Sequence, residues 1–351
     1  MKQTFFNDID ELISFIKGKK ILLVCGSSYD KLDFSEKLQD LKMTRFSDFS
    51  PNPLYEDVCK GVDIFKENNC EIILAIGGGS AMDVAKCIKL FSKMKPNVNY
   101  LQQEYKDTEI PLIAIPTTAG TGSESTKHAV IYYEGAKQSV SHESIIPDYV
   151  CLVPSVLKNL PLYQKKCTML DALCQAIESW WSKNATEESI EYSKKAIELI
   201  EENYKEYLKS FSSENAQKML LASNYAGRAI NLTATTAPHA MSYKLTSLYK
   251  IPHGHAVAIC LPQVWEYMIS YINNYNSDKY KTLKQTFCDF PITLQRYKEL
   301  ILELGITCPV SENREKDIEI LTGSVNPERL KNNPIELDFN TLKSLYERIV
   351  K

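Results

Sequence analysis

The sequence lacks long apolar runs and an excess of charge of either sign. Its longest apolar stretches, such as ILLVC and AVAICL, are far shorter than the roughly 20 residues that a membrane-spanning helix needs. The 41 basic and 44 acidic side chains nearly cancel, so no overall field attracts nucleic acid or anionic lipid. We therefore expect no membrane and no nucleic-acid partner, and a small molecule as the ligand.

The sequence also lacks paired cysteines and a basic leader. Ten cysteines occur singly, without CxxC pairs, so we expect reduced thiols that pack as small apolar side chains. The first twenty residues carry acidic side chains where a secretory signal would be basic, and their apolar residues recur at helical spacing. This segment predicts an amphipathic helix, and we expect the chain in the cytoplasm.

Two patterns divide the sequence near residues 154–161. Before this point, runs rich in Val, Ile and Leu alternate with helical stretches, as in a parallel α/β sheet with crossover helices. The expected strands lie in 20–26, 71–80, 111–124 and 149–154, and the expected crossover helices in 31–42, 54–68 and 81–93. After this point, long helical patterns dominate, at 165–181, 187–207, 214–231 and 254–271. We expect a Rossmann-like, dinucleotide-binding α/β domain over 1–155 and an all-helical metal- and substrate-binding domain over 156–351.

A glycine-rich turn follows the second strand-like run. The stretch LAIGGGSAMDVAK places Gly77, Gly78 and Gly79 between a buried strand and a helix whose first turn contains Ser80 and Asp83. Glycines let the backbone approach a ligand closely, and the helix start offers N–H groups to a pyrophosphate. The spacing is neither GxGxxG nor a P-loop, so a plain tight turn is the alternative for this loop taken alone.

A second loop, IPTTAGTGSE, follows the next strand-like run. It carries Thr117, Thr118, Thr121 and Ser123 among glycines. Small hydroxyl and glycine residues at the carboxyl ends of two parallel strands mark the ligand site of an open α/β sheet. The two loops together predict a bound cofactor.

Three of the five histidines lie within seventeen positions, and His239 and His253 are two of them. Asp171 opens DALCQAIESWW, in which Asp171, Gln175 and Glu178 share one helical face by their spacing. A carboxylate and two imidazoles form a ligand set for a catalytic divalent metal, with a position left open. The alternative for each histidine alone is a helix cap or a satisfied core residue.

At these motifs the chain resembles the iron-containing, or group III, alcohol dehydrogenases. The resemblance covers nearly the whole length and lies in PNP at 51–53, GGGSAMDVAK, PTTAGTGSE, PDYVCLVP, DALCQAIES and PHGHAVAICLP. It implies that family's architecture, which it shares with dehydroquinate synthase. It also implies that the GGGS loop holds the cofactor pyrophosphate, and that Asp171, His239 and His253 bind the metal, with His255 in a supporting place.

Two residues depart from the family pattern. Gln175 stands where many members have a histidine as fourth ligand, and Tyr243 stands where many have a histidine near the nicotinamide. An amide oxygen can bind a hard divalent ion but is a poor ligand for soft ones. Gln175 is therefore a candidate metal ligand, and the choice between Fe2+ and Zn2+ stays open.

The resemblance also implies a nicotinamide cofactor, NADPH or NADH. We expect NADPH to be preferred, because Gly26 ends its strand where NAD-preferring members of the family tend to carry an Asp. The candidate cofactor contacts are Gly26, Ser27, Ser28, Gly77, Gly78, Gly79, Ser80, Asp83, Thr117, Thr118, Thr121, Ser123 and Lys137. A homodimer is expected.

The expected reaction is the metal-assisted reduction of a small aldehyde to an alcohol. DALCQAIESWW, TTAPHAMSYKLTS and PHGHAVA most resemble the phosphonoacetaldehyde reductase branch, whose product is 2-hydroxyethylphosphonate. The candidate substrate contacts are Arg228, Lys244, Thr235 and Thr236, and for the two cations a solvent-facing place is the alternative. Tyr243, a water ligand of the metal or a cofactor ribose hydroxyl could each relay the proton. The rival functions are a general alcohol or polyol dehydrogenase and a non-catalytic nucleotide-binding protein with a decayed metal site.

Overall fold

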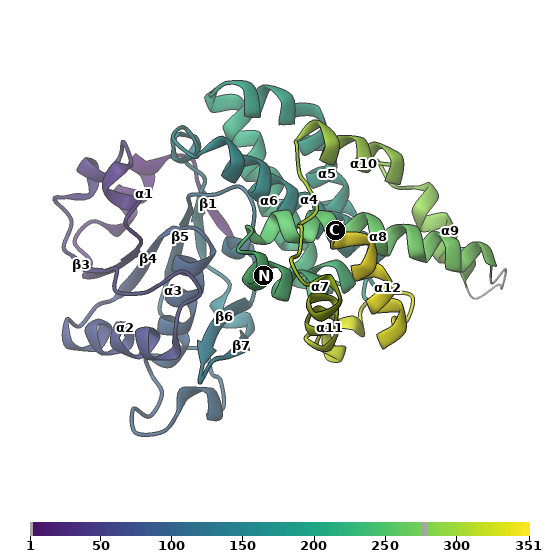
Figure 1. The fold of residues 1–351 in the computed structure, drawn as a ribbon. Helices are drawn as coiled ribbons and strands as arrows, with labels where there is room; N and C mark the ends of the chain where they lie inside the picture. The colour runs from purple at the N-terminus through teal and green to yellow at the C-terminus, as the bar shows by residue number, and fades with distance from the viewer. Residues whose placement is uncertain (1–2, 275–279) are drawn as a thin grey trace. The chain divides into compact units, whose positions relative to one another are not determined.

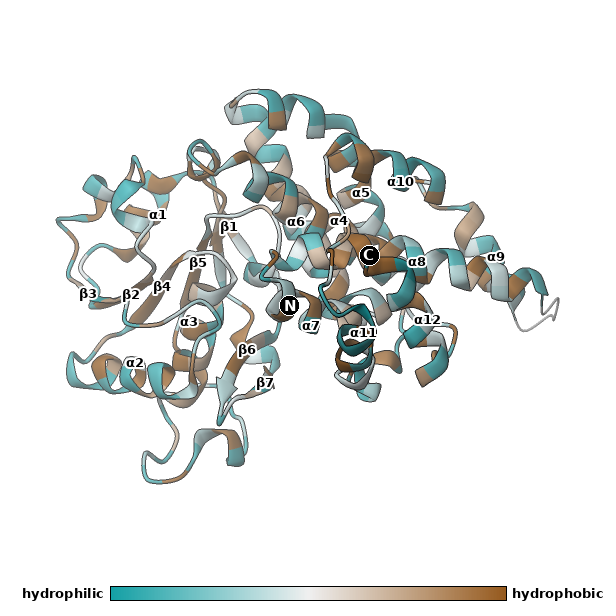
Figure 2. Cartoon of the chain, in the orientation of Figure 1, coloured by the Kyte–Doolittle hydropathy of each residue, from teal (hydrophilic) through white to brown (hydrophobic). Residues whose placement is uncertain are grey.

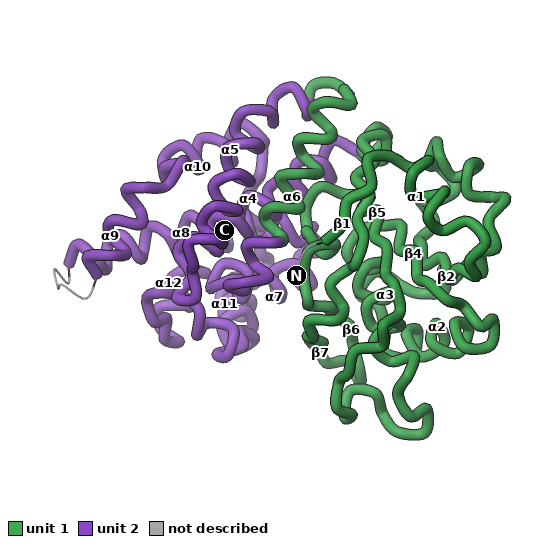
Figure 3. The backbone as a smooth tube through the Cα atoms, turned by 180° about the vertical axis from the view of Figure 1, so that it is seen from behind, with its two compact units in different colours: residues 1–160, 209–227 green, residues 161–208, 228–351 purple. Residues whose placement is uncertain are grey.

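The computed structural model describes residues 3–274 and 280–351. The chain divides into two compact units (Figure 3). Unit 1 consists of Met1–Leu160 and Lys209–Gly227, and unit 2 consists of Pro161–Leu208 and Arg228–Lys351. The expected domain boundary at residue 155 stays a prediction.

Unit 1 contains a six-stranded parallel sheet with the strand order β1-β8-β5-β4-β2-β3 (Figure 1). The strands are β1 (Thr4–Phe6), β2 (Ile21–Cys25), β3 (Met43–Phe46), β4 (Ile72–Gly77), β5 (Leu112–Pro116) and β8 (Tyr149–Cys151). Every residue of β2, β4 and β5 is buried, and Figure 2 shows hydrophobic colouring along β4. The four expected strands are confirmed, whereas the edge strands β1 and β3 escaped prediction because they are short and partly exposed.

Helices α2 (Tyr55–Glu67) and α3 (Gly79–Phe91) pack against each other, and α3 contacts β2, β4 and β5. Both helices are confirmed. A two-stranded antiparallel hairpin, β6 (His128–Tyr133) and β7 (Ala136–Ser141), packs against α3. Residues 3–160 of unit 1 therefore form a parallel α/β layer with a small appended hairpin, and residues 209–227 add most of helix α6 (Ser213–Thr233) to the same unit.

Two helix predictions in unit 1 need correction. The stretch 31–42 forms no α-helix, only the 3-10 turns η1 (Tyr29–Lys31) and η2 (Ser35–Leu38). The Ser35 hydroxyl donates to the Leu32 carbonyl at 2.8 Å, a local bond that favours a turn over a helix. Of the expected N-terminal helix, only α1 (Ile9–Ile16) forms, after β1, and residues 1–2 lie outside the described residues.

The described part of unit 2 is helical, with α8 contacting α4, α7, α10 and α12. The helices of the second half of the chain are α4 (Leu162–Trp181), α5 (Glu187–Lys209), α6 (Ser213–Thr233), α7 (Ala237–Tyr249), α8 (His253–Asn274), α9 (Lys281–Cys288), α10 (Leu294–Glu303), α11 (Arg314–Gly323) and α12 (Phe339–Ile349). The four long helices expected from the sequence are confirmed as α4, α5, α6 and α8. No helix in 3–274 or 280–351 has both the length and the apolar character needed to cross a membrane.

All ten cysteines are free thiols, as expected. Six of them are buried, among them Cys174 on α4 and Cys260 on α8. Burial raises the pKa of both thiols well above its ordinary value. These cysteines therefore pack as neutral apolar side chains.

Candidate metal centre and cofactor loops

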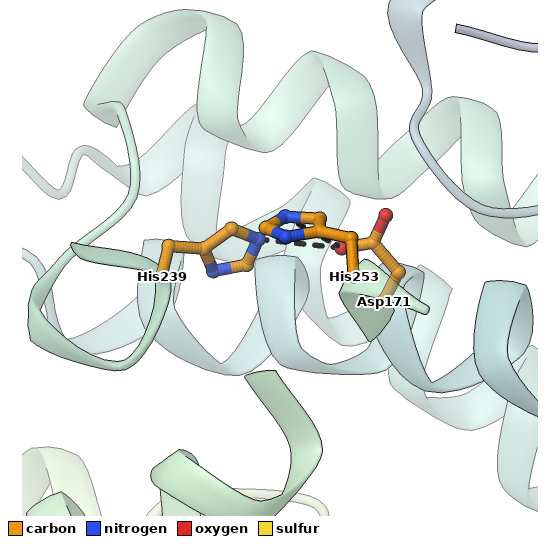
Figure 4. Close-up of side chains that lie close together, drawn as sticks. All are labelled: Asp171, His239 and His253. Carbon is orange, nitrogen blue, oxygen red and sulfur yellow. Dashed lines mark hydrogen bonds and ion pairs between the residues drawn. The ribbon is translucent and has the colours of Figure 1, made fainter. Parts of the chain in front are cut away.

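Three helices of unit 2 bring Asp171, His239 and His253 together (Figure 4). Asp171 lies in the middle of α4, His239 in the first turn of α7, and His253 at the start of α8. The Nε2 atom of His239 lies 3.3 Å from Oδ1 of Asp171, and Nε2 of His253 lies 4.0 Å from the same oxygen. One possible ligand atom from each residue lies within 4.8 Å of the other two.

A glycine sets the distance between α8 and α4. A Cβ atom on Gly254 would lie 1.9 Å from the carbonyl oxygen of Cys167 and 3.0 Å from Cβ of Asp171. Any larger residue would force the two helices apart. Gly254 therefore holds its neighbour His253 close to Asp171.

Glu178, two turns after Asp171 on α4, orients His239. Its carboxylate is fully buried and accepts the Nδ1–H of His239. The other carboxylate oxygen accepts the backbone N–H of Thr236 at 2.6 Å and its hydroxyl at 2.9 Å. With its Nδ1–H given to Glu178, His239 directs Nε2 toward Asp171; without a metal ion Nε2 carries a second proton that Asp171 accepts, and a metal ion would take the place of that proton. The helical spacing in the sequence predicts that Glu178 shares the face of Asp171, but its bond to His239 is visible only in the structure.

The charges of the centre favour a bound cation. Burial opposes ionisation of Asp171, but the hydrogen bond with His239 and the charges of His253 and His239 outweigh it, so the pKa of Asp171 is lowered. Burial likewise opposes protonation of His239, but Glu178 and Asp171 raise the pKa of this imidazole to about 9. Two buried carboxylates around one imidazole thus stabilise a positive charge, which a proton or a metal ion can supply.

The donor set fits a divalent metal ion. In a tetrahedral site with metal–ligand bonds of about 2.0–2.1 Å, neighbouring ligand atoms lie roughly 3.4 Å apart. The separation of 3.3 Å between His239 Nε2 and Asp171 Oδ1 matches this value, whereas His253 Nε2, at 4.0 Å from that oxygen, would have to move slightly closer to bind the same ion. Asp171 and His239 are buried, whereas the side chain of His253 is 35% exposed, so the centre is accessible from the side of His253.

The two residues that depart from the family pattern both lie beside this centre. Gln175 follows Asp171 by one turn of α4, is buried, and hydrogen-bonds the Asp171 carboxylate. The ring of Tyr243 on α7 stacks on the ring of His253, with centroids 5.6 Å apart and planes at 7°. Gln175 as a fourth metal ligand stays a prediction.

His255 forms two hydrogen bonds outside the metal cluster. Its Nε2 lies 2.8 Å from the carbonyl oxygen of Thr307, to which it donates, and its Nδ1 lies 2.7 Å from the hydroxyl of Tyr163. Both ring nitrogens are therefore engaged. This arrangement supports the structural place that the resemblance implies for His255.

The candidate substrate contacts lie in different surroundings. The guanidinium carbon of Arg228 on α6 lies 5.7 Å from the ring centroid of Tyr192 on α5. Thr236 gives both its N–H and its hydroxyl to Glu178. Lys244 on α7 and Thr235 just before it are partly buried. Their contact with a substrate stays a prediction.

One cation near the centre was not found from the sequence. Arg329, in the 3-10 turn η8 (Pro327–Leu330), donates from Nη1 to the Tyr243 hydroxyl at 3.2 Å, and its guanidinium carbon lies 5.1 Å from the Tyr243 ring centroid. The two residues are 86 positions apart. No motif surrounds Arg329 in the sequence, so only the tertiary structure identifies it.

The expected cofactor loops meet at one edge of the sheet of unit 1. Gly26 follows β2, the GGGS loop begins at the end of β4, and Thr117 follows β5. These strands are neighbours, with Cys25 opposite Ile76 and Gly77 opposite Pro116. Helix α3 begins at the GGGS loop without a side-chain cap, so its first N–H groups and its dipole suit a pyrophosphate.

Small residues let the two loops lie against each other. A Cβ on Gly77 would meet Cβ of Ala81 at 2.6 Å, which only a glycine avoids. A Cβ on Gly79 would lie 3.3 Å from Thr121 Cγ2, and one on Gly78 would lie 3.6 Å from Thr118 Cγ2. Ser80 lies in the first turn of α3, and Ser27 and Ser28 are exposed beside Gly26.

A buried lysine supports the threonine-rich loop. Lys86 on α3 is fully buried and donates to the Ser123 hydroxyl at 2.9 Å, to the Thr126 hydroxyl at 3.0 Å and to the His128 carbonyl at 2.8 Å. Burial lowers the pKa of Lys86 to about 8, against the charges of Asp83 and Glu124. The motif DVAK places this lysine on the helix that follows the glycines, but its burial and its three partners are visible only in the structure.

Two candidate cofactor residues belong to the same network. The carboxylate of Asp83 accepts the Ser123 hydroxyl and the Val130 N–H, both at 3.0 Å. Lys137 on β7 contributes electrostatically to the environment of Asp83. These bonds hold the loop in shape, and direct contact of Asp83, Ser123 or Lys137 with a cofactor stays a prediction.

A nucleotide-type loop in one unit and an Asp-His-His cluster in the other define a metal-dependent dehydrogenase. Two family models match the chain, "Iron-containing alcohol dehydrogenase" over residues 2–154 and "Fe-containing alcohol dehydrogenase family, C-terminal" over residues 166–350. The chain belongs to the iron-containing alcohol dehydrogenase family.

Relatives and solved structures agree with this family. The chain is 34% identical to the probable alcohol dehydrogenase EutG of Escherichia coli K12 over 263 residues, which cover 72% of this chain and 66% of that protein. It is 31% identical to the NAD-dependent methanol dehydrogenase of Bacillus methanolicus over 71% of this chain and 68% of that protein. The crystal structure of sulfoacetaldehyde reductase from Bifidobacterium kashiwanohense in complex with NAD+ matches with a TM-score of 0.84 and 25% identity, over 99% of this chain and 96% of that one.

Proposed function

We propose that the chain reduces a small aldehyde with an anionic tail to the alcohol, using NADPH or NADH and one divalent metal ion. Phosphonoacetaldehyde, reduced to 2-hydroxyethylphosphonate, is the best single candidate. The observation that carries the proposal is the convergence of Asp171, His239 and His253 from three helices, with Glu178 fixing the imidazole tautomer. A decayed, non-catalytic site would have no reason to keep both the ligands and this buried support.

When bound, the metal ion polarises the carbonyl oxygen as a Lewis acid and the nicotinamide donates the hydride. The chain's own residues prepare the centre. Glu178 holds His239 with Nε2 toward Asp171, and Gly254 keeps His253 at that carboxylate. Tyr243, stacked on His253 and accepting an N–H of Arg329, keeps its own hydroxyl hydrogen and is a candidate donor of the proton to the product oxygen.

Cofactor binding is assigned to unit 1. The edge formed by Gly26, the GGGS loop and Thr117 offers backbone N–H groups and hydroxyls, and Gly26 has open space where a Cβ would lie. Gly26 stands where NAD-preferring members of the family tend to carry an Asp. Because Gly26 has no carboxylate that would repel a 2′-phosphate, it supports NADPH as the preferred cofactor. The proposed metal is Fe2+ or Zn2+. The proposed assembly is a homodimer in the cytoplasm.

A general alcohol dehydrogenase is the second candidate. It is favoured by the names of two relatives, the probable alcohol dehydrogenase EutG and the methanol dehydrogenase. The name of the structural neighbour, sulfoacetaldehyde reductase, favours an aldehyde with an acidic tail. The two candidates differ in whether the site gains free energy from a charged group on the substrate.

An aldehyde panel separates these functions. Protein loaded with Fe2+ or Zn2+ is assayed by NADPH and NADH oxidation with phosphonoacetaldehyde, sulfoacetaldehyde, propionaldehyde and butyraldehyde. We expect kcat/KM for phosphonoacetaldehyde to exceed that for butyraldehyde by about 100-fold, which corresponds to about 2.7 kcal/mol of transition-state binding. Equal values would favour the general alcohol dehydrogenase, and no turnover of any aldehyde would favour a non-catalytic protein.

A further inference from the structure

Arg329 combines a partly buried side chain with the lack of an acidic partner; Arg314 and Arg348 also form no ion pair with the described residues, but their side chains are exposed. Arg45 pairs with Asp30, and Arg296 pairs with Glu201 and Glu303. Among the residues that the structure describes, no carboxylate forms an ion pair with Arg329, although the side chain is partly buried. A guanidinium remains charged at any physiological pH, so Arg329 presents an uncompensated positive charge.

The nearest acid in the sequence is engaged elsewhere. Glu328, the residue before Arg329, pairs with Lys331 at 2.5 Å, and both of these side chains are exposed. On the neighbouring helix α11, Asp317 accepts the hydroxyls of Tyr249 at 2.7 Å and Ser311 at 2.6 Å. The charge of Arg329 is therefore left for a ligand to neutralise.

Tyr243 connects this charge to the metal centre. The Arg329 guanidinium lies against the Tyr243 ring and donates to its hydroxyl, while the same ring stacks on His253. His253 is the most exposed of the three proposed metal ligands. The guanidinium thus lies one aromatic ring away from the accessible side of the centre.

The geometry suits an oxyanion. Within residues 3–274 and 280–351, only one of the five guanidinium N–H donors has a side-chain partner, the Tyr243 oxygen. The remaining donors form a planar fork that matches the oxygens of a phosphonate or sulfonate better than a lysine would. The hydrogen bond and the ring contact to Tyr243 hold the fork in place, so less conformational entropy is lost when an anion binds.

We propose that Arg329 is the specificity-determining residue that binds the anionic tail of the aldehyde substrate. This inference rests on the proposed function and names the residue that selects the substrate class. It adds to the candidates from the sequence a cation that the structure itself connects to His253. A neutral aldehyde gains nothing from this charge.

The test compares Arg329→Met with wild type on matched substrates. We expect Arg329→Met to lower kcat/KM about 100-fold for the phosphonate or sulfonate aldehyde, mainly through KM, and to change it less than about 3-fold for butyraldehyde. Arg348→Met, which removes an exposed arginine from α12, serves as the control and should change neither value. The preference of wild type for the phosphonate or the sulfonate identifies the anion.

A second readout measures binding without turnover. Calorimetric titration of the metal- and NADPH-loaded protein with 2-hydroxyethylphosphonate, a pair that cannot react because both partners are reduced, should show an affinity about 100-fold weaker for Arg329→Met than for wild type. Arg329→Lys retains the charge and should recover part of this loss. It also keeps the test valid if the methionine variant does not fold.

The outcomes distinguish the inference from the proposed function. An equal fall for charged and neutral aldehydes would mean that Arg329 acts only by positioning Tyr243, and no fall for charged aldehydes would mean that another group binds the tail. Either result overturns the inference. If wild type reduces neutral aldehydes without preferring charged ones, the inference fails and the dehydrogenase stands. If wild type reduces no aldehyde, both the inference about Arg329 and the proposed function fail.

Discussion

The metal centre and the cofactor loops are built from different parts of the polypeptide. In unit 2, side chains from three helices converge, and each contributes one atom that a neighbour cannot replace. In unit 1, backbone groups at adjacent strand ends form the candidate cofactor site, and the side chains are expected to matter mainly by being small. The metal centre should therefore be sensitive to loss of a functional group, and the loops to gain of size or charge.

The largest effect should come from removing a metal ligand. His239→Ala takes away one imidazole and leaves the Glu178 carboxylate without its partner. We expect loss of bound metal and a fall of about 10³-fold or more in kcat/KM, measured by elemental analysis and aldehyde turnover. His142→Ala is the control, because that histidine lies in unit 1 and bonds Ser144. Full metal content in His239→Ala would show that the cluster is not the metal site.

Adding a charge to the cofactor edge should change selectivity. Nothing lies within 4 Å of a Cβ atom on Gly26, so an aspartate fits there. Two unit charges about 4 Å apart at an effective dielectric near 20 interact by roughly 4 kcal/mol, an upper limit for repulsion of a 2′-phosphate. We expect Gly26→Asp to shift the NADPH/NADH ratio of kcat/KM by about 100-fold toward NADH. Gly26→Asn has nearly the same size without the charge and should keep the NADPH preference, whereas an unchanged ratio in Gly26→Asp would place the ribose elsewhere.

A variant of Glu178 tests whether metal affinity depends on the residue that orients a ligand as well as on the ligands themselves. Glu178→Gln can accept the His239 proton, but its amide group then turns an N–H toward the Thr236 N–H. We expect metal affinity to fall by about 10- to 100-fold, measured by competition with a chelator. Glu191→Gln, on the exposed face of α5, should not change it. If Glu178→Gln binds the metal as tightly as wild type does, Glu178 does not contribute to metal binding and its role is purely structural.

The smallest effect concerns the buried lysine of unit 1. The pKa of Lys86, lowered by burial from 10.5 to about 8, means that the unfolded chain binds more protons than the native protein between these values. Stability from this group therefore rises with pH in that window, by at most about 1.4 kcal/mol per pH unit. The free energy of unfolding of Lys86→Met should be lower than that of wild type, and the gap between the two should be larger at pH 10 than at pH 8. Cysteine and tyrosine side chains titrate in both proteins, so their contribution cancels from this gap. Lys93→Met, an exposed change, should show a constant difference, and a shrinking deficit in Lys86→Met would contradict the lowered pKa.

Much of unit 1 could be predicted because its signals are local. The buried strands β2, β4 and β5 appear as continuous apolar runs, and the GGGS loop is contiguous in the sequence. The predicted helix over 31–42 was wrong. The apolar spacing of this stretch suits a helix, but the Ser35 hydroxyl donates to the Leu32 carbonyl and stabilises turns. The edge strands β1 and β3 are too short and exposed to produce a pattern.

The metal ligands were predicted from a family resemblance together with their chemistry, whereas their surroundings required the structure. Glu178 carried a signal, its position on the helical face of Asp171, but its bond to His239 depends on how α7 packs on α4. Arg329 carried no signal, because its contact with Tyr243 joins residues 86 positions apart. Long-range pairs of this kind become visible only when the helices are assembled.

Aldehyde reduction should depend on a metal ion held by Asp171, His239 and His253. The most direct test of this dependence is the turnover of the preferred aldehyde by protein stripped of metal, with the metal content verified by elemental analysis. We expect metal-free protein to remain folded but inactive, and one equivalent of Fe2+ or Zn2+ to restore activity in wild type and not in His239→Ala. Full turnover by verified metal-free protein would contradict this dependence.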